Sequence, residues 1–115
     1  MSSQLEDLNR SVLFVQPRQA FLDWVKKDKQ FRKLTLEQLQ AEGTAYLLPA
    51  VFSSGVQQKF TSVYWREIFE LELAAWTETK SEWPEGRSLE MFQEWFEVRF
   101  SSLCLDLVDE PLGPL

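Results

Sequence analysis

The first clear strand signal in the chain is Ser11-Val-Leu-Phe-Val-Gln16, a run that is ended by Pro17. The four central residues of this run are all apolar and do not alternate with polar residues. A strand with one face in water usually alternates, whereas a strand that is covered on both faces does not need to. The run therefore predicts a strand that lies in a sheet flanked by helices.

Four helices are predicted outside this strand. Pro17 suits a first helical turn, and the best-marked helix is the short one after Thr35, because Thr35 and Gln38 have the spacing of a capping box and Gly43 supplies a stop. Two later helices are expected to begin at serine N-caps. They run from Ser54 to about Thr79 and from Ser88 to about Glu97.

Two more strands are predicted at residues 44–48 and 98–108, the latter with Leu103, Leu105 and Leu107 on one face. The order of elements is then β-α-α-β-α-α-β. Connections of more than about 20 residues fit crossovers better than hairpins. We therefore predict an α/β or α+β fold whose three-stranded sheet is at least partly parallel. One domain is expected over residues 1–115, with an ordered core of roughly 10–108 and flexible tails at 1–9 and 110–115.

The charge of the chain is acidic and uneven. The net charge of −6 divides into +2 for residues 1–63, −5 for residues 64–100 and −3 for residues 101–115. An acidic protein is a poor match for nucleic acid or for an anionic membrane surface. The longest apolar stretch, residues 45–52, is too short to cross a bilayer. A single cysteine, Cys104, and a start without signal-peptide features favour a cytoplasmic location.

The absence of histidine restricts the chemistry that the chain can perform. Ser-His and Cys-His nucleophilic pairs and histidine metal sites are excluded. No calcium-loop spacing occurs, and Cys104 is expected to be a buried, inert thiol. We therefore expect no cofactor, no metal and no catalytic residue, which favours a binding function over an enzymatic one.

The predicted long helix carries two apolar stripes, and only one can face the sheet. The second stripe consists of Trp65, Phe69, Leu73 and Trp76. Packing against another helix of the same domain is the favoured interpretation, and an interface with a partner or a second copy is the alternative. The first stripe, which suits the sheet, consists of Val56, Phe60, Val63, Tyr64, Ile68, Leu71 and Ala75. Glu67 falls within this stripe, so it is expected to be buried and to need a cationic partner.

Several short segments combine Trp, Phe, Leu, Pro and Glu in a recognisable arrangement. They are Tyr46-Leu-Leu-Pro49, Glu67-Ile-Phe-Glu70 with Leu73 and Trp76, Trp83-Pro84 with Arg87-Ser-Leu89, Phe92 with Trp95-Phe96, and Asp106-Leu107 with Glu110-Pro-Leu112. Through these segments most of the chain resembles a family of small bacterial proteins without an assigned activity. The resemblance implies a bacterial cytoplasmic protein and assigns no catalytic residue.

Three functions remain open at this point. The leading hypothesis is a non-enzymatic module that binds a protein partner, or a second copy, through an acidic aromatic surface. Its candidate residues are Trp65, Phe69, Leu73, Trp76, Trp83 and Arg87. The second hypothesis is a ligand-binding or enzymatic domain in which Glu67 pairs with Arg18 or Arg87. The third is a single-stranded nucleic-acid binder that uses the basic, aromatic segment 24–33.

Overall fold

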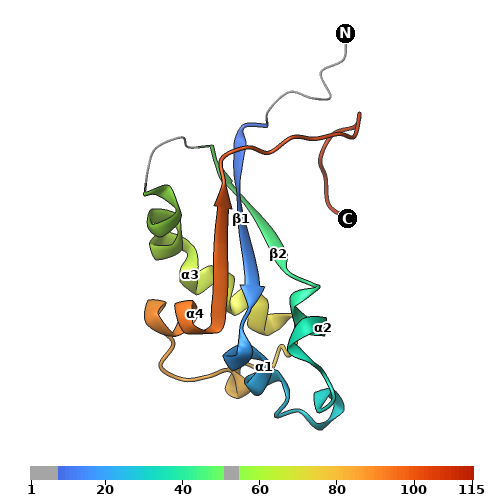
Figure 1. Ribbon diagram of the computed structural model, residues 1–115, viewed down its shortest axis with the longest axis vertical. Helices are drawn as coiled ribbons and strands as arrows, with labels where there is room; N and C mark the ends of the chain where they lie inside the picture. The colour runs from blue at the N-terminus through green and yellow to red at the C-terminus, as the bar shows by residue number, and fades with distance from the viewer. Residues whose placement is uncertain (1–7, 51–54) are drawn as a thin grey trace.

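The computed structural model describes residues 8–50 and 55–115, and Figure 1 shows how they are arranged. Within these ranges the fold is α+β, with one three-stranded sheet, four α-helices and two short 3₁₀ helices. The strands are β1 (Arg10–Pro17), β2 (Thr44–Pro49) and β3 (Phe96–Ser101). The helices are α1 (Gln19–Val25), η1 (Lys29–Phe31), α2 (Leu36–Gln40), α3 (Val56–Ala74), η2 (Lys80–Glu82) and α4 (Leu89–Trp95).

The sheet is antiparallel throughout, so the prediction of a partly parallel sheet is wrong. Its strand order is β2-β1-β3, with β1 at the centre. Leu13 of β1 lies opposite Tyr46 of β2 on one side and Phe100 of β3 on the other, and both pairings are antiparallel. It follows that β2 and β3 run in the same direction but never pair, because β1 lies between them.

The lengths of the connecting helices explain this topology. The eight residues of β1 span about 27 Å, whereas the seven-residue α1 and five-residue α2 span only about 10 and 8 Å. The β1–β2 connection therefore stays near the end of β1, and β2 returns beside it (Figure 1). The 19-residue α3 spans about 28 Å, which is enough to carry the chain back along the sheet. Because α3 carries the chain back in this way, β3 runs in the same direction as β2.

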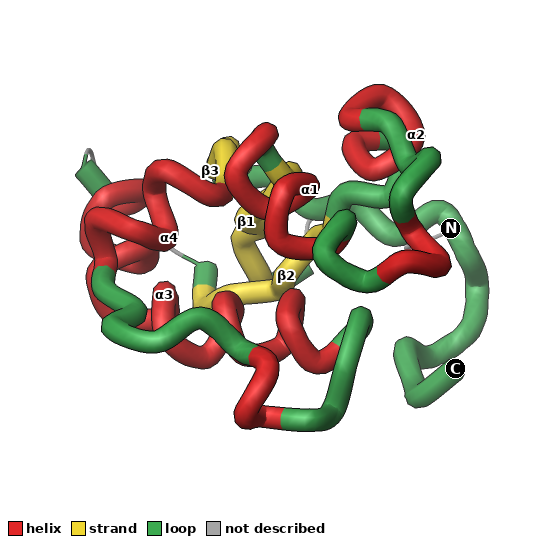
Figure 2. Tube along the Cα trace, turned by 90° about the horizontal axis from the view of Figure 1, so that it is seen from below, coloured by secondary structure: helices red, strands yellow, loops and turns green. Residues whose placement is uncertain are grey.

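The two faces of the sheet are covered unequally. Leu13 and Val15 belong to the buried core together with Phe60 and Ile68 of α3, which covers this face. Figure 2, which looks along the sheet, places α2 on the other side. There Phe14 of β1 remains 49% exposed. The expectation of helices over both faces is therefore met only in part.

The buried side of α3 changes along its length. Near its start, Phe60 contacts the ring of Phe100 on β3, with the ring centroids 6.1 Å apart. Farther along, Phe69 contacts the rings of Phe92 and Phe96, at 5.9 and 5.5 Å. The side of α3 that faces the core therefore turns gradually along the helix. Phe60 and Ile68 of the first stripe and Phe69 and Leu73 of the second are buried, whereas Val63 of the first stripe is 63% exposed.

The predicted helix ends agree with the structure in part. The capping box of α2 is confirmed, because Thr35 and Gln38 exchange both expected hydrogen bonds. Gly55 precedes α3 with a φ of +76°, a conformation that glycine adopts without a steric penalty. The predicted cap Ser54 lies outside the described residues. The helix itself ends at Ala74, five residues before the predicted end.

The last strand is earlier and shorter than predicted. Its final residue, Ser101, lies opposite Val12, only two residues from the start of β1 at Arg10. Further residues of β3 would therefore have almost no central strand to pair with. The leucines predicted to share one face of the strand lie after it in the structure and are exposed. They are Leu103, Leu105 and Leu107.

Candidate functional site

The six residues of the predicted partner surface do not form one surface. Phe69 and Leu73 are fully buried, and Trp83 is 9% exposed. Trp65 and Trp76 are partly buried, and they lie beside different cavities. The internal packing interpretation is therefore correct for Phe69 and Leu73, which contribute to the core.

The buried ion pair predicted for Glu67 is not observed, because Glu67 is exposed on α3. Val63 and Leu71, one turn before and one turn after it in the first stripe, are also exposed, so this line of α3 faces solvent although the adjacent Ile68 is buried. Arg18 is exposed, and Arg87 instead lies 3.6 Å from Glu70. The hypothesis of a site built on a buried Glu67 is therefore not retained.

Trp65 and Arg87 line a small depression of about 290 Å³ with Arg66, Glu70 and Gly86. The guanidinium of Arg87 donates to the Pro84 carbonyl at 2.8 Å, and it lies 5.6 Å from the centre of the Trp83 ring. The ion pair with Glu70 connects the loop before α4 to α3, and the other two contacts lie within that loop. They occupy the arginine within its own chain, which makes this depression a weaker binding site than the one described next.

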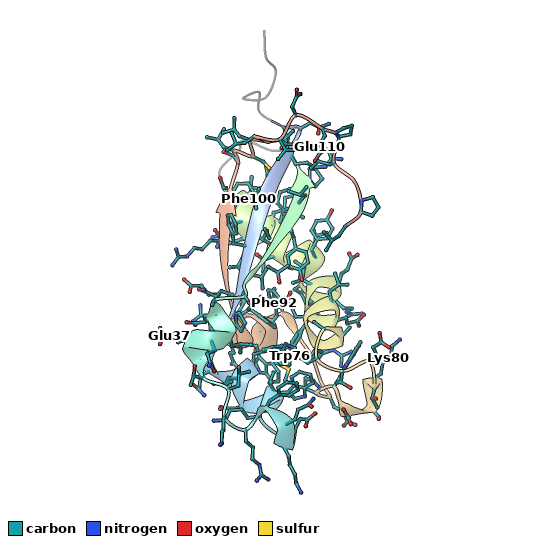
Figure 3. All side chains as sticks on the ribbon, turned by 90° about the vertical axis from the view of Figure 1, so that its right-hand side faces the viewer. Glu37, Trp76, Lys80, Phe92, Phe100 and Glu110 are labelled. Carbon is teal, nitrogen blue, oxygen red and sulfur yellow. The ribbon has the colours of Figure 1, made fainter. Side chains whose placement is uncertain are left out.

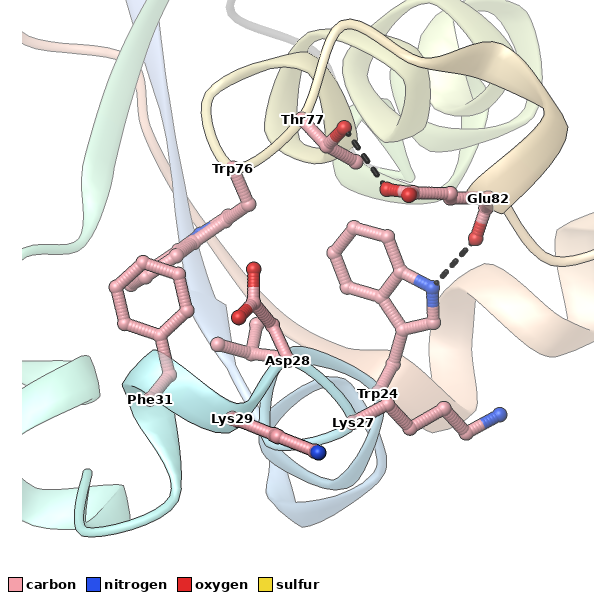
Figure 4. Close-up of a pocket in the computed structure, with 9 residues that line it drawn as sticks. Trp24, Lys27, Asp28, Lys29, Phe31, Trp76, Thr77 and Glu82 are labelled. Carbon is pink, nitrogen blue, oxygen red and sulfur yellow. Dashed lines mark hydrogen bonds between the residues drawn. The ribbon is translucent and has the colours of Figure 1, made fainter.

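A larger cavity, of about 620 Å³, lies between the segment that follows α1 and the segment that follows α3. We call it the aromatic pocket, and Figure 4 shows its lining residues. These are Trp24, Val25, Lys27, Asp28, Lys29, Phe31, Trp76, Thr77 and Glu82. In Figure 3 the labelled Trp76 lies toward the opposite end of the molecule from Phe100 and Glu110. The pocket is therefore remote from the end of the sheet at which the chain leaves β3.

The rings of the pocket are held in place by their neighbours. The indole N–H of Trp24 donates to the Glu82 carbonyl at 3.0 Å, and the same ring lies 5.5 Å from Phe21 in the core. On the other side, Phe31 and Trp76 meet edge to face, with centroids 4.9 Å apart and planes at 89°. Such an arrangement is favoured by the charge distribution of aromatic rings. Both sides of the pocket are therefore formed before any ligand arrives.

The segment after α3 is also fixed by hydrogen bonds. The Trp83 indole N–H donates to the Thr77 carbonyl at 3.0 Å, and the Thr77 hydroxyl donates to the Glu82 carboxylate at 3.1 Å. Trp83 thus supports the pocket from behind, although it does not line it. This is a different role from the direct contact predicted for it.

The charged groups of the pocket have a clear arrangement in Figure 4. The carboxylate of Asp28 lies between Trp24 on one side and Phe31 and Trp76 on the other. The ammonium group of Lys27 lies beyond the Trp24 ring, and that of Lys29 lies below the Asp28 carboxylate in this view. A molecule between the rings would therefore meet aromatic surface and the Asp28 carboxylate.

Sequence reasoning found the parts of this pocket separately. Trp24 and Phe31 were assigned to a basic nucleic-acid segment, and Trp76 to a partner surface. Nothing in their spacing shows that they meet, because the contact depends on α3 returning the chain to the end of the sheet where α1 lies. No motif or spacing in the sequence singles out Asp28 or Glu82 as a pocket residue.

One polar contact connects the sheet to α3. The hydroxyl of Tyr46 on β2 donates to the Glu72 carboxylate. Burial of the phenol, together with the adjacent Glu72 carboxylate, raises the pKa of Tyr46 above its ordinary value of 10.0. The contact was not anticipated from the sequence. It lies on the covered face of the sheet and does not reach the pocket.

The described residues show neither a metal-binding cluster nor a membrane-spanning helix. Over residues 8–50 and 55–115, no group of three or more Cys, Asp or Glu side chains is arranged to hold a metal ion. No helix in the same ranges has the length and apolar character needed to span a bilayer.

Comparison with known proteins adds no relative. No protein-family model matches the chain, and no curated protein or solved structure shows significant similarity to it. The aromatic pocket is therefore the feature of the molecule from which a function can be inferred.

Proposed function

We propose that this protein is a non-enzymatic interaction domain that binds a partner protein through the aromatic pocket. The observation that carries the proposal is the set of three partly buried rings around a cavity of about 620 Å³, all fixed by contacts within the chain. Aromatic side chains, and Trp above all, dominate the binding energy of protein interfaces.

The preformed shape of the pocket supports binding. A side chain that enters it removes apolar ring surface from water without first ordering a loop. Association otherwise loses free energy when flexible groups are immobilised, so a rigid pocket leaves more of the contact energy for affinity. The acidic charge of the chain, −6 overall, favours a basic partner through long-range attraction.

A peptide library displayed on phage and selected against the intact chain tests this function. The affinity of selected peptides would be measured by calorimetry for the natural protein, Trp76→Ala and a control, Leu71→Ala. Leu71 is 52% exposed on α3 and does not line the pocket, so it matches Trp76 as an apolar truncation. Trp76→Ala is expected to weaken binding at least about tenfold, as truncation of an interface anchor does. Leu71→Ala is expected to have no effect.

Equal affinities for the three proteins would overturn the proposal, provided that circular dichroism shows all three to be folded. Light scattering over a range of concentrations covers the case in which the partner is a second copy. An apparent mass that rises with concentration for the natural protein but not for Trp76→Ala would support self-association through the pocket.

A second candidate, single-stranded nucleic acid, is favoured by one observation. Lys27 and Lys29 line the same pocket as Trp24 and Phe31. Stacked bases and phosphate contacts would use both kinds of side chain. Binding of oligo(dT) at low ionic strength, lost in a Lys27→Ala, Lys29→Ala double variant, would support this candidate in place of a protein partner.

A further inference from the structure

The interior of the aromatic pocket has a property that the proposed function does not use. The carboxylate of Asp28 lies between the rings (Figure 4), and neither of the two lysines that line the pocket forms an ion pair with it. We infer that the side chain bound by the pocket is an arginine guanidinium of the partner protein, with Asp28 as its anionic contact. This inference rests on the proposed function and specifies its ligand.

The rings favour a cation. The face of an aromatic ring carries partial negative charge, so a cation within about 6 Å of its centre is attracted to it, most strongly by Trp. Trp24 and Trp76 both line the pocket, and Phe31 adds a third ring. A guanidinium is planar and weakly hydrated, so it stacks on rings and enters an aromatic cavity at less cost than an ammonium does.

Asp28 provides the matching charge. One of its carboxylate oxygens, Oδ1, accepts the Gln30 backbone N–H at 3.1 Å, which holds the side chain in its orientation. No described residue donates to the other oxygen, Oδ2, which is left for a ligand donor. In the described parts of the chain, the two ion pairs are Arg87–Glu70 and Arg99–Glu97, so no described cation forms an ion pair with the Asp28 carboxylate.

A neutral apolar guest would fit less well. It would displace water from the Asp28 carboxylate and offer no hydrogen bond in return, which is costly for a charged group. An anionic guest would meet the same carboxylate directly. A guanidinium both satisfies the carboxylate and covers the rings, so it is the common side-chain group that uses every surface of the pocket.

Titration with a small probe, N-acetyl-arginine amide, tests the inference directly. The indole N–H resonances of Trp24 and Trp76 would be followed by NMR on the intact chain, after assignment with Trp→Phe variants. Both resonances are expected to shift with saturation at millimolar concentrations. The citrulline analogue, which is neutral and nearly the same shape, is expected to shift neither. The lysine analogue is expected to bind more weakly than arginine.

Asp28→Asn supplies the variant test. Asparagine also caps helices well, so the fold of η1 should survive. The affinity for the arginine probe is expected to fall about tenfold, the size of one charge-assisted hydrogen bond. Asp23→Asn is the matched control. Asp23 is a nearby exposed carboxylate that accepts a hydrogen bond from the Gln19 side chain and does not line the pocket. This variant is expected to change the affinity less than twofold.

Four results would overturn the inference. Equal shifts from arginine and citrulline probes would show that charge is not recognised. Equal affinities of a five-residue arginine peptide and the capped amino acid would assign a free guanidinium compound in place of a protein. Tighter binding of oligo(dT) than of arginine would assign nucleic acid. If the selected peptides need Trp76 for binding but contain no arginine, the proposed function stands and only the inferred guanidinium ligand is wrong.

Discussion

Two groups of aromatic rings in this molecule make ring contacts of similar length and differ in burial. The core ring cluster, formed by Phe69, Phe92 and Phe96, has centroid separations of 5.1 to 5.9 Å and exposures of 0 to 1%. The pocket rings are Trp24, Phe31 and Trp76, and all three are partly exposed. Two of them are Trp, and one of these donates a hydrogen bond to a backbone carbonyl. Similar ring contacts therefore stabilise the fold in the core ring cluster and leave an accessible surface at the pocket rings.

The largest effect is expected where the core ring cluster is opened. Phe92→Ala should lower the free energy of unfolding by about 3–5 kcal/mol, because a fully buried ring is lost and a cavity remains. Phe14→Ala makes the same chemical change at a ring that is 49% exposed on the sheet. It should cost less than about 1.5 kcal/mol, since little burial is lost. Urea denaturation followed by tryptophan fluorescence measures both, and equal losses would remove the distinction between core and surface rings.

A smaller, pH-dependent effect is expected at the polar contact beside the core. Tyr46→Phe should lower the free energy of unfolding by about 1–2 kcal/mol at neutral pH, because the hydrogen bond to the Glu72 carboxylate is lost. The pKa of Tyr46 is raised in the folded protein above 10.0, so the phenol ionises first in the unfolded chain. The stabilisation is therefore complete below pH 10 and decreases above it.

Denaturation curves at pH 7, 9, 10.5 and 11.5 would check this sign. The difference between the natural protein and Tyr46→Phe should stay constant up to about pH 10 and then shrink. Tyr64→Phe is the control, because Tyr64 has no hydrogen bond of this kind to a carboxylate in the described chain. A difference that grows with alkaline pH would contradict the assigned direction.

A still smaller effect tests how the pocket rings are held. Trp24→Phe removes the hydrogen bond to the Glu82 carbonyl and keeps an aromatic ring in place. The free energy of unfolding should fall by about 1 kcal/mol, typical of one neutral hydrogen bond. The affinity for a pocket ligand should fall as well, since the ring loses its fixed position. Unchanged affinity with reduced stability would show that this bond serves only the fold.

The smallest effect concerns the pair of rings on the other side of the pocket. A double-mutant cycle of Phe31→Leu and Trp76→Leu should give a coupling energy of about 0.5–1 kcal/mol, as for other edge-to-face pairs. The same cycle on Phe69 and Phe92 should give at least as much, because both rings are fully buried. A coupling of zero at the pocket would mean that Phe31 and Trp76 move independently in solution.

Local features of the fold were predictable from the sequence, whereas its topology was not. The capping box of Thr35 and Gln38 was correct because both partners lie within one helical turn. The prediction of a partly parallel sheet is wrong because the total length of a connection does not determine the direction in which the next strand runs. The lengths of the individual helices carry that information, since only α3 is long enough to span the sheet.

The site was less predictable than the fold for a related reason. Trp76 was singled out correctly as a residue to inspect, but its neighbours Trp24 and Phe31 come from a segment that sequence reasoning treated as separate. Glu67 was misplaced because one helical stripe was assumed to stay buried over all of α3. A helix that packs first on a sheet and then on α4 changes its buried side, and periodicity alone does not show where.

The central position of β1 has a consequence for how the chain is made. This strand is the first in the sequence, and its second partner, β3, ends only at Ser101. During synthesis β1 can pair with β2 once residue 49 has emerged, but its other edge must wait for some fifty further residues. Unpaired strand edges are the sites at which nascent chains associate wrongly. Expression at a lower temperature, or together with chaperones that shield such edges, should therefore improve the yield of this protein more than changes to its core.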